Sequence, residues 1–240
     1  PSRGLGDVYK RQMWFTLLSV GVFGFFVSTD LFTMFMFYEV ALIPMYLLIG
    51  VWGSGRKEYA AMKLTLMLMG GSAFLLIGIL GIFYGAGGET MNLLEIAKLH
   101  IPHEMQRIFF PLIFLGFGVL GALFPFHTWS PDGHASAPTA VSMLHAGVLM
   151  KLGGYGCFRV AMYLMPEGAA MWGDVFLILT TISVVYGAFS AVVQTDLKYI
   201  NAYSSVSHCG LVLFALLMMT RTSCCLLYTS PSPRDGLLSR

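Results

Sequence analysis

Long apolar segments alternate with short polar ones along almost the whole chain. Each long segment approaches the roughly 20 residues that a helix needs to cross a bilayer. This pattern predicts an all-α, polytopic integral membrane protein with about seven transmembrane helices. The expected spans are 13–27, 31–52, 60–84, 108–126, 139–164, 173–193 and 200–219.

Two prolines, Pro125 at the end of the fourth span and Pro131 shortly after it, interrupt the chain before the fifth span. Both cannot lie inside one unbroken helix, because proline lacks the amide hydrogen and frees a carbonyl on the preceding turn. In lipid, such freed backbone groups need protein or water as partners. The sequence therefore predicts a helix broken at 124–131 that lines a hydrated cavity, as in transporters.

Composition supports a membrane protein and excludes several other classes. Of the 240 residues, 57% are hydrophobic and 11% are charged, against about 25% charged in soluble domains. The net charge of +2 comes without a basic run, so we expect the lipid bilayer and not nucleic acid as a partner. The His100 and His103 pair lacks further metal ligands, and Gly85–Gly88 lacks the lysine of a phosphate loop; neither predicts a bound metal or cofactor.

Two ionisable residues lie inside the expected spans and are the first candidates for function. Lys151 lies in the 139–164 span, and Glu39 lies in the 31–52 span close to Pro44. A charge in the membrane must be paired, neutralised or hydrated, and it is expensive against lipid. We therefore expect both side chains to face the bundle interior. An interhelical hydrogen bond is the alternative role for Glu39.

Three histidines extend this set, because an imidazole gains or loses its proton near neutral pH. His208 lies inside the 200–219 span, and His145 lies six residues before Lys151. His127 lies in the expected break, where capping of the backbone is as good an explanation as proton transfer. The candidate proton relay is thus Glu39, Lys151, His145, His208 and His127.

The two ends of the chain differ from everything between them. Back-translation of Asp7–Gln12 gives codons whose reverse complement, shifted by one base, reads Cys225–Ser230. Such an inverted repeat resembles transposon-type sequencing-library adapters. We therefore expect residues 1–12 and 225–240 to be adapter-like artefacts, and residues 13–224 to be one membrane domain cut from a longer gene.

Three motifs, in this order and spacing, carry a family resemblance: FYEVALIPMY at 37–46, FPFHTWSPDGHASAPTAVSMLHAGVLMKLGGYG at 124–156 and QTDLKYINAYSSVSH at 194–208. Together they resemble the chain M, or subunit 4, type of NADH–quinone oxidoreductase, respiratory complex I. The resemblance implies an antiporter-like helix bundle with inverted repeats, in a bacterial inner membrane among other membrane-arm subunits. It implies that the chain translocates protons and binds no cofactor, while NADH, FMN, iron–sulfur clusters and quinone belong to other subunits.

The resemblance also assigns roles to single residues. Glu39 matches a glutamate coupled to a lysine, Lys151 matches a membrane lysine, and His208 matches a histidine of the hydrophilic axis. Leu120 stands where most relatives carry the lysine partner of that glutamate, and our hypothesis is that His145 replaces it. The alternatives are a subunit of a multisubunit sodium/proton antiporter or of a membrane-bound hydrogenase-type complex, and an inert scaffold in which Lys151 and Glu39 pair.

Overall fold

The computed structural model describes residues 5–99 and 101–219, and regular structure in this part is entirely helical. The helices are α1 (Leu5–Val27), α2 (Leu31–Trp52), α3 (Lys57–Gly85), α4 (Leu93–Ile96), α5 (His103–Leu120), α6 (Trp129–Ser136), α7 (Thr139–Leu144), α8 (Met150–Gly156), α9 (Pro166–Val193) and α10 (Leu197–Leu217). Two π-helical segments, η1 (His145–Leu149) and η2 (Cys157–Met162), flank α8 and join it to its neighbours.

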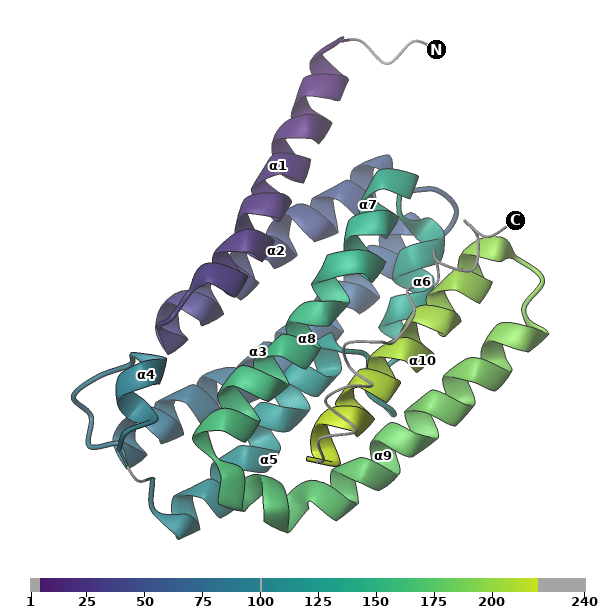
Figure 1. The fold of residues 1–240 in the computed structure, drawn as a ribbon. Helices are drawn as coiled ribbons and strands as arrows, with labels where there is room; N and C mark the ends of the chain where they lie inside the picture. Colours follow the sequence, from purple (N-terminus) through teal and green to yellow (C-terminus); the bar gives the residue numbers. More distant parts are fainter. Residues whose placement is uncertain (1–4, 100, 220–240) are drawn as a thin grey trace, which may run out of the picture.

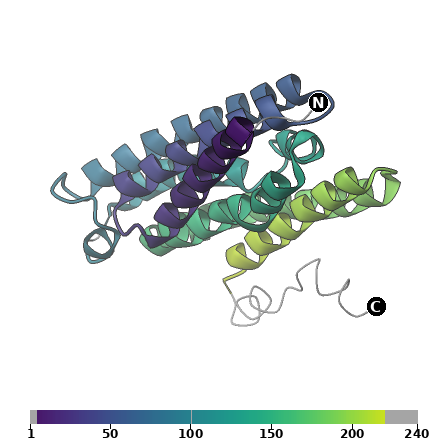
Figure 2. The ribbon, with the colours of Figure 1, turned by 90° about the horizontal axis from the view of Figure 1, so that it is seen from above.

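The long helices run up and down in one bundle (Figure 1). α1 packs on α2, α3 on α5 and α9 on α10, and the view from above shows α9 and α10 side by side at one edge (Figure 2). Within the described part, four helices are long and apolar enough to cross a membrane, namely α2, α3, α9 and α10. α1 and α5 are not among these four, and the 139–164 stretch is helical throughout but alternates α and π turns, so the expected count of seven crossings stays a prediction.

Two expected spans agree closely with helices, whereas the 108–126 span extends six residues beyond the end of α5. The 31–52 span is α2 with the same bounds, and the 60–84 span is α3 with three residues added at its start and one at its end. α1 begins before residue 13, so part of the first adapter-like segment is helical, and residues 6–13 are exposed. The origin of that segment stays a prediction, and residues 225–240 and His100 lie outside the described residues.

The expected break is present, but its limits differ from the prediction. α5 ends at Leu120, a series of turns follows, and α6 begins at Trp129. Pro131 is the third residue of α6, so it lies inside a helix and not in the break. It is tolerated there because the first amide hydrogens of a helix have no acceptor within the helix. A second interruption follows at residues 137–138.

Side chains and backbone groups from distant helices hold the broken region in place. The indole Nε1 of Trp129 donates to the carbonyl of Val119 at 3.1 Å, which ties α6 to the end of α5. The Lys198 amine donates to the carbonyls of Ala135 and Ala137 at 3.2 and 3.3 Å. Freed carbonyls around the second interruption thus receive a charged donor, as membrane backbone requires.

Small residues bring the 139–164 helix against α5. A Cβ on Gly153 would lie 2.5 Å from the backbone nitrogen of Gly121, and one on Gly156 would lie 2.4 Å from the Phe117 ring. Both positions need glycine for the close approach, in the manner of membrane helix interfaces. This packing fixes the helix just after Lys151, which lies at the midpoint of the span.

Candidate functional site

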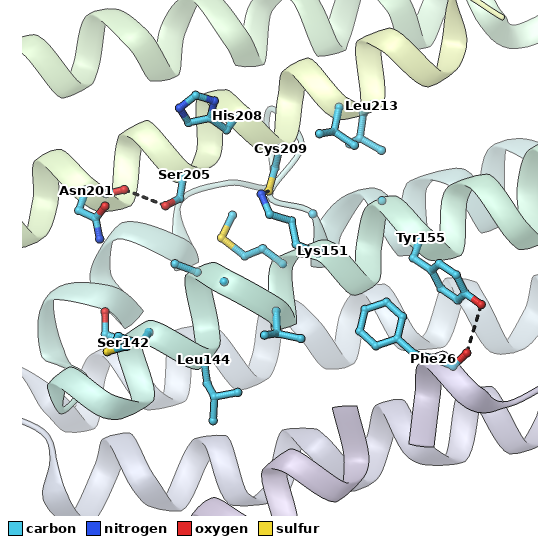
Figure 3. A pocket seen from close by; sticks show the side chains of 18 of the residues that line it. Phe26, Ser142, Leu144, Lys151, Tyr155, Asn201, Ser205, His208, Cys209 and Leu213 are labelled. Atoms are coloured by element: carbon cyan, nitrogen blue, oxygen red, sulfur yellow. Dashed lines mark hydrogen bonds between the residues drawn. The ribbon is translucent and has the colours of Figure 1, made fainter. Parts of the chain in front are cut away.

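Lys151 projects into a cavity of about 1090 Å³ that runs along the 139–164 helix. Side chains of α1 and α10 form its other walls, and most of its lining is apolar. Figure 3 shows the lysine side chain extending from α8 toward α10 across this space. The polar residues that line the cavity, besides Lys151, include Thr139, Ser142, Lys198, Asn201, Ser205 and His208.

The Lys151 amine has a weak partner. Its Nζ lies 3.6 Å from the Sγ of Cys209 on α10, and a thiol is a poor hydrogen-bond acceptor. Among the described residues, no carboxylate lies within 4.0 Å of this amine. His208 lines the same cavity, and in Figure 3 its ring is turned away from the amine. Lys151 is therefore half-buried in the middle of its span, and residues 5–99 and 101–219 give it no fixed counter-ion.

A second polar cluster lies behind the cavity, where α6 meets the 139–164 helix. The rings of His134 and His145 have their centroids 4.2 Å apart, and Trp129 stacks on His145 at 5.2 Å. His134 Nδ1 lies 3.0 Å from the hydroxyl of Ser142. Both histidines are buried, and Ser142, which contacts His134, also lines the cavity.

An ion pair connects α3 to α6 on another side of the bundle. The Lys63 amine lies 2.6 Å from Oδ2 of Asp132, and 5.6 Å from the centroid of the Tyr59 ring. The two charged side chains keep 23% and 29% of their surface exposed. Within the part of the chain that the structure describes, this is the one salt bridge between side chains. It anchors the short helix that carries His134.

Glu39 and His127 lie apart from the cavity. Glu39 is on α2, and within residues 5–99 and 101–219 its buried Oε1 has no hydrogen-bond partner. His127, in the break, stacks on Phe124 at 5.6 Å and meets the Tyr186 ring edge-on at 4.9 Å. Neither residue lines the space around Lys151.

A family model covers this arrangement and most of the chain. Residues 28–230 match the model described as NADH:quinone oxidoreductase/Mrp antiporter, transmembrane. The chain belongs to this antiporter family. The match includes all the candidate residues, together with the break between α5 and α6.

Sequence relatives of this antiporter-family chain are quinone oxidoreductase subunits. The chain is 43% identical over 205 residues to NAD(P)H-quinone oxidoreductase chain 4 3 of Picosynechococcus sp., covering 85% of this chain and 37% of that relative. It is 40% identical over 216 residues to the chloroplastic chain 4 of Citrus sinensis, covering 89% and 43%. The chain thus spans about two fifths of the length of these relatives.

Solved structures of two kinds share the fold. Respiratory complex I from Thermus thermophilus matches with a TM-score of 0.81 and 29% identity, over 86% of this chain and 44% of that one. A membrane-bound sulfane sulfur reductase, an archaeal respiratory complex, matches with 0.78 and 29%, over 85% and 42%. The antiporter-family fold is therefore shared by complexes with different electron chemistry.

Of the predicted relay in this antiporter-family chain, the structure places Lys151 and His208 along one cavity. His145 lies behind that cavity, while Glu39 and His127 lie elsewhere. Leu120 is fully buried at the end of α5. Trp129, which bonds to Val119 and stacks on His145, lies between that end of α5 and the histidine.

Sequence reasoning missed the Lys63–Asp132 ion pair and the place of Ser142 between histidine and cavity. Lys63 lies within the 60–84 span. A lysine inside an apolar span demands a partner, and Asp132 is a carboxylate directly after the expected break. The ion pair could therefore have been predicted from the sequence. The packing of His134 on His145 could not, because it depends on how α6 folds back against η1.

Proposed function

We propose that this chain is part of a proton-translocating, membrane-arm subunit of an NADH–quinone oxidoreductase in a bacterial inner membrane. Residues 13–224 form its antiporter-like domain with about seven crossings, and residues 1–12 and 225–240 derive from adapters. Electron transfer from NADH through FMN and iron–sulfur clusters to quinone takes place in partner subunits, and this chain binds none of these groups.

One observation carries the proposal: the Lys151 amine, at mid-span, reaches into a cavity of about 1090 Å³ without a carboxylate partner among the described residues. Thr139, Ser142, Asn201 and Ser205 on its wall offer hydrogen bonds to water around the amine. A lysine that is hydrated but not ion-paired can accept a proton and release it again, because no fixed negative charge holds the ammonium form. His208, on the wall of the same cavity, is the next proton acceptor.

The other predicted residues act on this centre from a distance. Glu39, whose Oε1 is buried and unpartnered in the described part of the chain, changes the local field when it gains or loses a proton. His145 exchanges protons with the cavity from behind the 139–164 helix. His127, held between aromatic rings in the break, is the outermost member of the relay.

The test is Lys151→Ala in the full-length protein inside the assembled complex. Quinone reduction and proton pumping are recorded together in sealed vesicles, and assembly is followed on native gels. We expect normal assembly with a collapse of pumping, by roughly 100-fold or more for a lost acid–base group. A purely structural lysine would instead give lost assembly, and undiminished pumping would show that the proton path runs elsewhere.

A second candidate is a subunit of a related complex with other electron chemistry, or of a sodium/proton antiporter. The observation in its favour is the similar TM-score for the sulfane sulfur reductase, 0.78 against 0.81. Purification of the complex through this subunit decides between them. NADH-dependent quinone reduction supports the first proposal, whereas sodium-dependent transport without NADH oxidation supports the second.

A further inference from the structure

Two imidazoles are buried together at the junction of the broken helix and the 139–164 helix. His134 is 1% exposed on α6, and His145 is 0% exposed in η1. Their ring centroids lie 4.2 Å apart, with 33° between the ring planes. The chain reverses at residues 137–138 between them, so the second interruption brings the two rings face to face.

Most ring nitrogens of this pair are without a partner. Among the described residues, both nitrogens of His145 and Nε2 of His134 are buried and make no hydrogen bond. Buried polar atoms nearly always have a partner, and exceptions often mark a functional site or bound water. The remaining nitrogen, His134 Nδ1, faces the Ser142 hydroxyl at 3.0 Å, and Ser142 lines the cavity that holds Lys151.

The surrounding structure holds the rings in this geometry. A Cβ on Gly133 would lie 3.2 Å from Cε1 of His145, so α6 approaches the ring as closely as a residue without a side chain allows. Trp129 covers another side of His145, with its ring stacked at 5.2 Å. η1 begins at His145 itself, and π-helical turns occur frequently at functional sites.

We propose that His134 and His145 act as one proton-holding pair, which exchanges its proton with the Lys151 cavity through the hydroxyl of Ser142. The proposal rests on the proton-translocating function proposed above and adds His134 and Ser142 to its residues. Two imidazolium rings at this distance would repel each other, so the pair holds at most one proton.

The transfer step conserves charge and atoms. The protonated pair donates a proton from His134 Nδ1 to the Ser142 oxygen, and the same hydroxyl releases its own proton to a water in the cavity. Ser142 ends neutral, the pair ends neutral, and one positive charge has moved into the space around Lys151. The return step is the same exchange in reverse.

The test uses the full-length protein in its assembled complex, with His134→Gln, His145→Gln and Ser142→Ala variants. Glutamine keeps hydrogen-bonding atoms but cannot carry the proton. His103→Gln is the matched control, because His103 is exposed at the start of α5. We expect pumping to fall roughly tenfold or more in each pair variant, with normal assembly, and to stay unchanged in the control.

A spectroscopic measurement separates proton sharing from a merely structural role. ¹⁵N NMR of histidine-labelled complex follows the protonation of each ring against pH, and His134→Gln should shift the pH at which His145 titrates if the two rings hold one proton together. An unchanged His145 titration, or normal pumping in both glutamine variants, would overturn the proposal. If only Lys151→Ala loses pumping, the proposed function stands and the histidine pair is rejected. Normal pumping in every variant would reject both the proposed function and the histidine pair. If the glutamine variants do not assemble, the signals of the unaltered complex and of Ser142→Ala decide.

Discussion

Lys63 and Lys151 both lie within helices of this bundle, and their surroundings are opposite. Lys63 on α3 forms a 2.6 Å ion pair with Asp132, while Lys151 on α8 has a thiol at 3.6 Å and a large cavity. The first amine has a fixed negative charge beside it, whereas the described part of the chain places no carboxylate next to the second. A charge held by a counter-ion positions helices, whereas a charge that only water and weak acceptors meet is free to change its protonation.

The sharpest way to test this difference is the same substitution at both sites. Arginine keeps the positive charge but does not release its proton in proteins. Lys63→Arg should therefore preserve assembly and pumping, because a guanidinium pairs well with the Asp132 carboxylate. Lys151→Arg should preserve assembly but lower pumping by roughly 100-fold or more, the size of a lost acid–base group.

Pumping and quinone reduction, measured together in sealed vesicles, check this prediction. Normal pumping by Lys151→Arg would show that the cavity needs only a fixed positive charge. Lost pumping by Lys63→Arg would show that both amines exchange protons, and the distinction between the two lysines would then disappear.

Substitution of Cys209 can give Lys151 a carboxylate partner like the one that Lys63 has in Asp132. Cys209→Asp would place a carboxylate close to the amine, and two opposite charges 4 Å apart attract by about 4 kcal/mol at an effective dielectric constant of 20. The ammonium form is then stabilised, and pumping should fall roughly tenfold or more as proton release becomes slow. Cys209→Ser, which keeps a neutral partner, is the control.

Proton release can be followed as the rate of pumping at saturating NADH, and assembly as the yield of intact complex. If Cys209→Asp pumps as fast as Cys209→Ser, then the absence of a carboxylate near Lys151 is not what makes this lysine mobile. The unaltered thiol would in that case be a packing residue only.

The sequence predicted the positions of α2 and α3 well, because long hydrophobic segments are local signals. It predicted the break but not its limits, since Pro131 is compatible with both a break and the first turn of α6. It could not separate Lys151 and His208, which share a cavity, from His145, which faces the other side. Residues six positions apart on a helix point in different directions, but which direction meets water depends on the packing of α6 and α10.

The Lys63–Asp132 pair should affect stability much more than transport. Asp132→Ala leaves the Lys63 charge half-buried without its partner, and this should cost about 2 kcal/mol, below the range for fully buried pairs because both side chains are partly exposed. The complex should therefore dissociate at a lower temperature, while each intact complex pumps normally. Reversal of the pair, with Lys63→Asp and Asp132→Lys together, should recover most of the stability because the attraction between the two sites is kept.

Thermal dissociation and pumping per intact complex measure the two effects separately. If Asp132→Ala lowered pumping per intact complex as far as Lys151→Ala does, Lys63 would belong to the proton path. A nearby counter-ion would then not distinguish a structural lysine from one that exchanges protons.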